Sequence, residues 1–235
     1  VQKFRYEPAL RGLVEGILDE TESLREARAA AICSFGEAAV PVLVETLAGP
    51  DAPLAAFVTD LLVQLRDVAA EPVAALLNRT SAAARLVAVR ALGPMRNDIA
   101  TAALARAVTD DDQQVRHEAA RALALIGPSA GELLMDGLRE PDPVRRSRVC
   151  EALAMHGTEV LDAVASLLTY DDPNVVLAVL ETLGRSHRLG YVECVASVLD
   201  DLREPVRVGA CEALGLMGTP QAAEVLIDAL YFDDA

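Results

Sequence analysis

Three histidines and the carboxylates near them are the residues of this chain whose chemistry suits metal binding. His117 is followed directly by Glu118, and His and Glu side chains are ligands of zinc and iron. One such pair leaves most of a coordination sphere empty, and His156 and His187 are distant in the sequence. We expect His117 on a solvated helix face and His156 as a hydrogen-bonded, neutral core residue. The sequence therefore predicts no metal centre and no other cofactor.

The sequence has none of the motifs of nucleophilic or phosphate chemistry. It contains no Gly-x-Ser-x-Gly, no phosphate-binding glycine loop and no His-Glu-x-x-His. The cysteines Cys33, Cys150, Cys194 and Cys211 form no Cys-x-x-Cys pair, and we expect free buried thiols. No apolar run approaches the roughly 18 residues that span a bilayer, and no signal peptide is visible. These features predict a cytoplasmic protein that is not an enzyme.

The composition favours closely packed helices. Hydrophobic residues make up 52% of the 235 residues and aromatic ones 3%, and the abundant Ala and Leu are strong helix formers. With 36 acidic and 21 basic residues the net charge is −15. This balance disfavours a nucleic-acid backbone or an anionic membrane surface as the main partner. We expect a protein partner, no nucleic acid and no direct membrane insertion of this segment.

A repeat of 30 or 31 residues runs through the chain. The position of Arg116 recurs as Arg25, Ala55, Arg85, Arg146, Val176 and Arg207. A fixed period in this range is the signature of a solenoid. In residues 111–140, Asp111 and Asp112 precede an amphipathic segment that ends at Gly127-Pro128, and a second amphipathic segment follows. Each repeat is therefore predicted to be an antiparallel helix pair that must stack on its neighbours.

These repeats predict an all-α fold, a right-handed α-solenoid. Residues 23–235 are expected to form seven repeats of a single array, after a partial repeat in residues 1–22. Both ends read like interrupted repeats, so we expect the segment to be part of a longer protein. The turn position of Gly127 is occupied by Arg66, Arg96 and His187 in three other units. We expect differently shaped turns in those three units.

The repeat units resemble HEAT repeats, in particular the short bacterial type that is also called phycobilin-lyase-like HEAT repeats. The segments 111–127, 171–176 and 204–218 carry the resemblance, which covers nearly the entire chain. It implies the solenoid fold. For function it implies a binding scaffold or, alternatively, a chaperone-like subunit of a bilin lyase or another cofactor-attachment enzyme.

Two enzyme families of related fold do not match the residues of this chain. His117-Glu118 resembles locally deoxyhypusine hydroxylase, whose di-iron centre uses several His–Glu pairs spread over its repeats. The matching positions here are Leu86-Val87, Ser147-Arg148, Leu177-Ala178 and Val208-Gly209, so the resemblance implies no complete ligand set. HEAT-like glycosylases that act on alkylated DNA are expected to have a basic groove with aromatic residues. An acidic chain without Trp does not fit that expectation.

Carboxylates recur on the predicted second helices. The core positions are Leu43, Val73, Leu104, Leu134, Val164, Val195 and Leu226, and two residues before them stand Pro41, Glu71, Ala102, Glu132, Asp162, Glu193 and Glu224. Two residues after the core positions, Glu45, Asp136 and Asp228 add further carboxylates. At about 100° per residue, both columns point away from the core. In HEAT arrays the second helices typically line the concave surface.

Two explanations of these carboxylates remain open. The helix dipole favours Asp and Glu in the first turn whatever the function. Alternatively, the columns form an acidic stripe that binds a basic segment of a partner. Further aspartates, such as Asp51, Asp112, Asp142 and Asp172, mark the turns between repeats and are expected to cap helices. The arginines at the Arg116 position are expected to form an Asp–Arg ladder between repeats.

The sequence thus predicts a protein-interaction scaffold, adaptor or regulatory domain that binds its partner on the concave face. The predicted partner-binding residues are Glu71, Glu132, Asp136, Asp162, Glu193, Glu224 and Asp228. Besides the lyase-subunit alternative, the segment is also compatible with a soluble docking or sensory arm of a larger membrane or multidomain protein.

Overall fold

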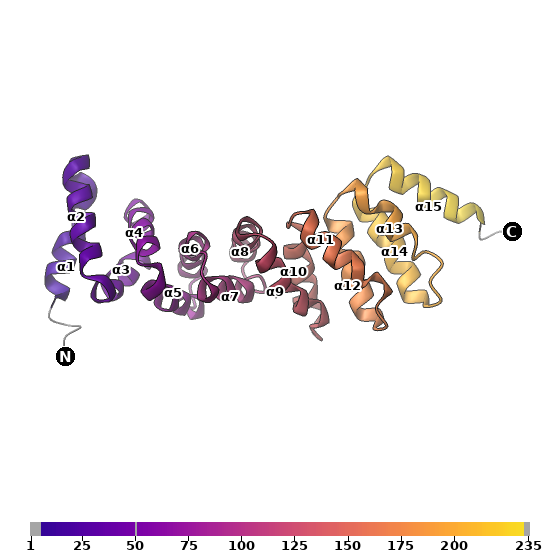
Figure 1. Cartoon of the computed structure of the whole chain (residues 1–235), viewed down its shortest axis with the longest axis horizontal. Coiled ribbons are helices and arrows are strands. Elements are labelled where there is room, and N and C mark those ends of the chain that lie inside the picture. The colour runs from indigo at the N-terminus through magenta and orange to yellow at the C-terminus, as the bar shows by residue number, and fades with distance from the viewer. Residues whose placement is uncertain (1–5, 50, 233–235) are drawn as a thin grey trace. The chain divides into compact units, whose positions relative to one another are not determined.

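The computed structural model describes residues 6–49 and 51–232, with the backbone alone for residues 230–232 (Figure 1). These residues form helices joined by turns, and none of them lies in a strand, which confirms the predicted all-α class. Residues 1–122 and residues 123–235 form two compact units, here called the N-terminal unit and the C-terminal unit.

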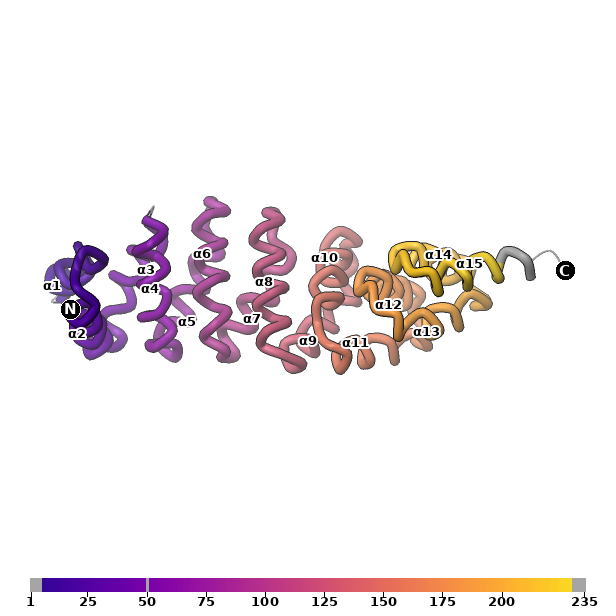
Figure 2. Tube along the Cα trace, turned by 90° about the horizontal axis from the view of Figure 1, so that it is seen from above, coloured from indigo at the N-terminus to yellow at the C-terminus, as the bar shows by residue number. Residues whose placement is uncertain are grey.

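The described helices follow the predicted order of helix pairs. The N-terminal unit contains α1 (Glu7–Val14), α2 (Glu22–Ser34), α3 (Val40–Leu47), α4 (Ala52–Gln64), α5 (Arg66–Ala74), α6 (Ala82–Leu92), α7 (Asp98–Ala107) and the start of α8 (Gln113–Ile126). The C-terminal unit continues with α9 (Pro128–Met135), α10 (Pro143–Ala154), α11 (Thr158–Ala165), α12 (Pro173–Arg185), α13 (Val192–Ala196), α14 (Glu204–Met217) and α15 (Pro220–Phe232). Short 3₁₀ segments are η1 (Ile17–Asp19), η2 (Gly36–Ala39), η3 (Ala75–Asn78), η4 (Gly93–Met95), η5 (Asp136–Arg139), η6 (Ser166–Thr169) and η7 (Leu189–Tyr191). Seven pairs, from α2/α3 to α14/α15, thus succeed one another along the described chain (Figure 2).

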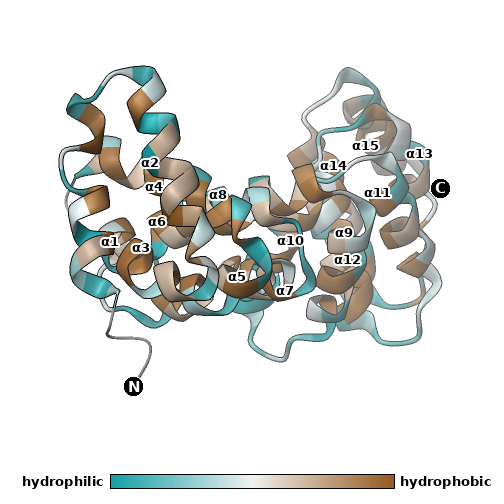
Figure 3. Cartoon of the chain, turned by 60° about the vertical axis from the view of Figure 1, so that its left-hand side comes forward, coloured by the Kyte–Doolittle hydropathy of each residue, from teal (hydrophilic) through white to brown (hydrophobic). Residues whose placement is uncertain are grey.

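Each repeat buries one apolar column on its second helix. The side chains of Leu43, Val73, Leu104, Leu134, Val164 and Val195 are at most 3% exposed, as the periodicity predicts. Leu226, the corresponding residue of α15, is half-buried. Apolar residues lie mainly along the helices, and hydrophilic ones gather in the turns (Figure 3). Because each repeat alone leaves its apolar stripe uncovered, stacking of neighbouring repeats supplies the core.

Glycines let some helices approach closely. A Cβ atom on Gly184 of α12 would lie 3.0 Å from both the Cα and the carbonyl oxygen of Ala213 in α14. We expect Gly184→Ala to lower the free energy of unfolding by about 1–3 kcal/mol, because backbone atoms of α14 have to move. Gly215→Ala is the control, since its Cβ would meet open space; it should be neutral or stabilise by up to about 1 kcal/mol. Urea denaturation followed by circular dichroism measures both, and equal effects would contradict the close approach.

The turns of these three units differ from the turn at Gly127, as expected, but two of them match the turns of other units that contain glycine. Arg96 and His187 adopt left-handed backbone conformations, with φ of 49° and 52°, as do Gly36 and Gly218 with 55° and 61°. Gly127 and Gly157 have φ of 117° and −70°, so the repeats share no single turn geometry. Arg96 and His187 are strained in the left-handed region, because they carry a Cβ atom. Arg66 differs, because it begins α5 after Leu65 with φ of −93°.

The turn aspartates cap the helices that follow them, as predicted. Asp51, Asp112, Asp142 and Asp172 accept hydrogen bonds from backbone N–H groups at 2.8–3.4 Å. These N–H groups have no partner within their own helix, so the caps stabilise the start of each first helix.

The predicted Asp–Arg ladder is wrong as a general feature of the repeats. From Nη1, Arg85, Arg116 and Arg207 each donate to the two carbonyl oxygens five and six residues earlier, at 2.8–3.4 Å. Arg146 binds the carbonyl oxygen of Glu140 at 2.7 Å. The turn that ends each repeat leaves these carbonyl groups without a helical partner, and the guanidinium group satisfies them. Among the described arginines of this column, Arg85 also forms an aspartate pair, with Asp110.

One repeat replaces its missing arginine with a residue from the next repeat. The column contains Val176 instead of Arg, and the carbonyl groups five and six residues earlier belong to Asp171 and Tyr170. Nη1 of Arg203, in the following turn, donates to both of these carbonyl oxygens, at 3.1 and 3.2 Å. Asp201 holds Arg203 in place through two charge-assisted hydrogen bonds of 2.9 Å. The same backbone groups are thus satisfied from a different repeat.

Candidate partner-binding site

The predicted partner-binding residues are all exposed. Glu71 lies on α5 of the N-terminal unit. The other six lie in the C-terminal unit: Glu132 on α9, Asp136 on η5, Asp162 on α11, Glu193 on α13, and Glu224 and Asp228 on α15. We call these six residues the acidic face. Because α9 packs on α11 and α13 packs on α15, successive repeats bring their carboxylates to equivalent surface positions.

Charge is segregated between first and second helices in the C-terminal unit. Helices α9, α11, α13 and α15 contain no Lys, Arg or His, whereas α10, α12 and α14 contain arginines at positions 145, 146, 148, 185 and 207. The helix dipole alone would also favour cations in the last turn of each second helix. Arg139 occupies such a position at the end of η5, directly after α9. The absence of cations from the last turns of α11, α13 and α15, and the location of Asp228 beyond the first turn of α15, are features that the dipole does not explain.

Most carboxylates of the acidic face are available to a partner. Within residues 6–49 and 51–232, no side chain forms an ion pair or hydrogen bond with Glu132, Glu193, Glu224 or Asp228. Asp136 is 92% exposed and lies 3.4 Å from Arg139, an exposed pair of small energetic value. The guanidinium group of Arg139 also stacks over the ring of Tyr170, 5.4 Å from its centroid.

Tyr191 is a residue of this site that the sequence reasoning missed. Its hydroxyl donates a hydrogen bond to Oδ1 of Asp162 at 2.7 Å and contacts the carbonyl oxygen of Thr158 at 3.3 Å. Burial and the Asp162 carboxylate together raise the pKa of Tyr191 to about 12, so the hydroxyl remains a donor at neutral pH. Tyr191 thereby fixes the Asp162 carboxylate on the acidic face. The sequence contained one hint of this role, because Tyr191 is one of few aromatic residues in the chain.

The histidines and cysteines occupy different environments. His117 is exposed, and His156 is 1% exposed. No hydrogen-bond partner for Nε2 of His156 is present in the described structure, so its predicted hydrogen bonding is wrong at this atom. Three or more His, Cys, Asp or Glu side chains do not gather into a metal-binding group among the described residues. The cysteines are free, but only Cys150 of the four is buried, and Cys211 on α14 is exposed, contrary to expectation.

A helix crosses a bilayer only when it is long and apolar enough. Among the described residues, no single helix has the length and apolarity to cross one. The segments Glu22–Ser34 and Gly36–Leu47 together reach that length and apolarity, with a bend of 111° between them.

The chain is similar to several solved structures. A Kap121p mutant has 15% sequence identity and a TM-score of 0.52, over 95% of this chain and 29% of that one. The CpcE–CpcF complex of phycocyanin lyase from Nostoc sp. PCC7120 has 20% identity and a TM-score of 0.35, over 92% of each chain. Human deoxyhypusine hydroxylase in complex with glycerol has 18% identity and a TM-score of 0.34, over 90% of this chain and 96% of that one. No curated protein matches the sequence significantly.

The family assignment rests on a direct match to the repeat sequence. The family model for HEAT repeats matches residues 69–154, 131–193 and 161–235, which together extend over more than half of the chain. The periodicity, the helix pairs and the buried columns agree with that match. The chain therefore belongs to the HEAT-repeat family.

Proposed function

We propose that this HEAT-repeat chain acts by binding rather than by catalysis, as a scaffold or adaptor that takes up a basic segment of a protein partner on the acidic face. HEAT repeats typically mediate protein interactions, and stacked repeats offer a long regular surface for them. The observation that carries the proposal is the segregation of charge in the C-terminal unit. Helices α9, α11, α13 and α15 present carboxylates and contain no basic residue, while Arg139 of η5 pairs with Asp136 beside them.

An exposed array of like charges favours a partner of opposite charge. Such complementarity accelerates association and selects partners, while its contribution to affinity depends on the individual contacts. Tyr191 contributes by holding the Asp162 carboxylate in one orientation, which lowers the entropy cost of ordering this side chain when a partner binds. An Arg-rich segment suits this surface best, because a guanidinium group binds a carboxylate through two parallel hydrogen bonds.

Charge reversal tests this proposal. We expect the triple variant Glu132→Lys, Asp162→Lys and Glu193→Lys to lose partners that the unmodified protein retains from a lysate of source cells, as quantified by mass spectrometry. The helical circular dichroism signal should be unchanged, because all three side chains are exposed.

A matched control separates the acidic face from overall charge. The triple variant Asp200→Lys, Glu204→Lys and Glu212→Lys makes the same change in net charge at exposed residues outside the acidic face. It should retain the partners. Equal retention by both triple variants, or equal loss, would refute a specific role of the acidic face.

A further inference from the structure

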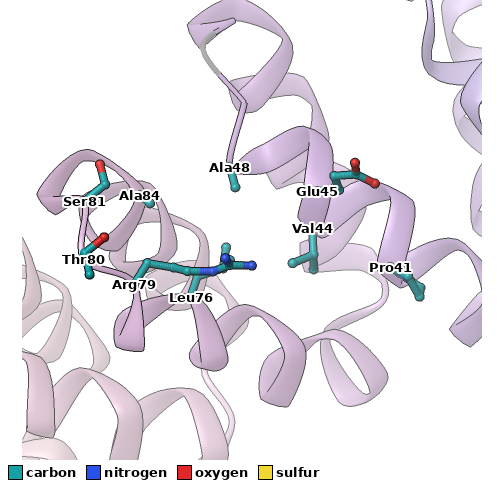
Figure 4. A pocket seen from close by; sticks show the side chains of 9 residues that line it. All are labelled: Pro41, Val44, Glu45, Ala48, Leu76, Arg79, Thr80, Ser81 and Ala84. Atoms are coloured by element: carbon teal, nitrogen blue, oxygen red, sulfur yellow. The ribbon is translucent and has the colours of Figure 1, made fainter.

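A cavity of about 530 Å³ lies in the N-terminal unit, between α3 and the segment that leads into α6 (Figure 4). Its apolar lining comes from Pro41, Val44 and Ala48 on one side and from Leu76 and Ala84 on the other. Binding sites of this volume are common in proteins, and apolar linings with a few polar groups are typical of them. The cavity is large enough to take an apolar side chain of a bound peptide together with its neighbours.

Arg79 is a charged side chain of this cavity that has no partner among the described residues. Two ionisable side chains line it, Glu45 and Arg79. The Glu45 carboxylate accepts a hydrogen bond from the guanidinium group of Arg11, which also pairs with Glu7. The Arg79 side chain extends into the cavity (Figure 4), and no described side chain forms an ion pair or hydrogen bond with it. The side of the cavity at Arg79, opposite Glu45, therefore favours an anionic group.

Hydrogen-bond donors beside Arg79 also suit a ligand that accepts hydrogen bonds. The hydroxyl-bearing residues Thr80 and Ser81 line the same side of the cavity. Ser81 precedes α6 without capping it through its side chain, so first-turn N–H groups of α6 have no side-chain cap there. A carboxylate placed beside Arg79 thus meets donors as well as a guanidinium group.

We propose that the cavity binds an acidic segment of a protein partner, in which an aliphatic side chain enters the apolar part and a neighbouring Asp or Glu pairs with Arg79. The apolar lining selects the aliphatic residue, and Arg79 selects the carboxylate. This site prefers the charge opposite to that preferred by the acidic face of the C-terminal unit. It does not depend on the function proposed for that face.

Selection from a displayed library of short random peptides tests the proposal. The unmodified protein should enrich peptides in which Asp or Glu stands next to Leu, Ile, Val or Met. An enriched peptide, labelled with a fluorophore, should bind Arg79→Glu about tenfold more weakly or worse in an anisotropy titration, because a charge-assisted pair is replaced by repulsion. Ala48→Trp, at an exposed position of the lining, should weaken the same peptide by filling the cavity.

Arg106→Glu is the matched control, because it makes the same charge change at an exposed arginine of α7 outside the cavity. It should leave the affinity unchanged, as should the triple variant of the acidic face. Failure to enrich peptides, enrichment of peptides without carboxylates, or equal affinity for Arg79→Glu would overturn the proposal. Displacement of the peptide by inorganic phosphate would also overturn it, because that result indicates a small-anion site. A dimer that Arg79→Glu abolishes would overturn it as well, because the occupant would then be a second copy of the chain.

Discussion

Replacement of His156 by Met is expected to stabilise the protein, and increasingly so at acidic pH. At pH 7 we expect a gain of about 1 kcal/mol in the free energy of unfolding, because the buried Nε2 atom without a hydrogen-bond partner is removed. Met suits the position, since Met95 and Met217 are buried at the equivalent positions of other repeats. Denaturant titrations at a series of pH values measure the difference.

The pH dependence follows from the burial of His156. Burial lowers the pKa of the folded-state imidazole below its usual value, while the unfolded chain has a pKa of about 6.5. As the pH falls below 6.5, the unfolded state binds a proton that the folded state rejects, so the unmodified protein loses stability. The loss is up to about 1.4 kcal/mol per pH unit until the folded pKa is reached. The advantage of His156→Met should therefore grow as the pH falls below 6.5.

His117→Met is the control for this experiment, because His117 is exposed. Its stability should follow the unmodified protein over the whole pH range. Parallel pH profiles for His156→Met and the unmodified protein would show that His156 does not carry the acid sensitivity.

Replacement of Arg85 by Ala is expected to lower the free energy of unfolding by about 3 kcal/mol. Its guanidinium group forms two hydrogen bonds with Asp110, at 2.7 and 2.9 Å, and the two side chains are 15% and 12% exposed. It also donates to the carbonyl oxygens of Arg79 and Thr80 at 3.0 Å. The variant leaves a mostly buried carboxylate and two carbonyl groups without these donors. Urea denaturation and amide hydrogen exchange in α6 measure the loss.

Arg90→Ala is the matched control, because the Arg90–Glu118 pair is 3.4 Å long and Arg90 is 57% exposed. It should cost less than about 1 kcal/mol. Similar losses for the two variants would show that the buried location of the Arg85–Asp110 pair is unimportant.

The Arg85–Asp110 ion pair also predicts how the free energy of unfolding changes in acid. Burial acts to raise the pKa of Asp110, but hydrogen bonds from Arg85 and from the backbone N–H of Asp112 outweigh it, and the pKa is lowered. Because the folded pKa lies below the unfolded value, this stabilisation is present above about pH 4 and is lost as the pH falls through the folded pKa. Arg85→Ala should therefore lose less stability between pH 4 and pH 2 than the unmodified protein.

The sequence predicted those parts of the fold that depend on periodicity. The buried column through Leu134 and Val164, and the exposure of Glu132 and Asp162 two residues earlier, follow from helical geometry alone. The hydrogen bond from Tyr191 to Asp162 does not, because it joins residues 29 positions apart whose contact depends on how two repeats stack.

The arginine contacts were mispredicted for a related reason. The sequence shows which residues are charged, but it does not show the directions of the carbonyl groups in a turn. Aspartates near Arg116 suggested an ion pair, whereas the carbonyl oxygens of Asp110 and Asp111 lie at 2.8 and 3.0 Å and receive its hydrogen bonds. The left-handed conformation of His187, with φ of 52°, was likewise not predicted, because glycine adopts it routinely and a residue with a Cβ atom seldom does.

The contact that Arg203 makes with the preceding turn has a consequence for how such an array changes in evolution. Repeat proteins gain and lose units by duplication and deletion of whole repeats, which is harmless when each unit satisfies its own backbone. Here the carbonyl groups of Tyr170 and Asp171, at the start of the repeat with Val176, accept hydrogen bonds from Arg203 at the start of the next repeat. A deletion or exchange that separates the two repeats would leave these groups without their donor, so we expect the two repeats to be kept or lost together, as a unit of about sixty residues.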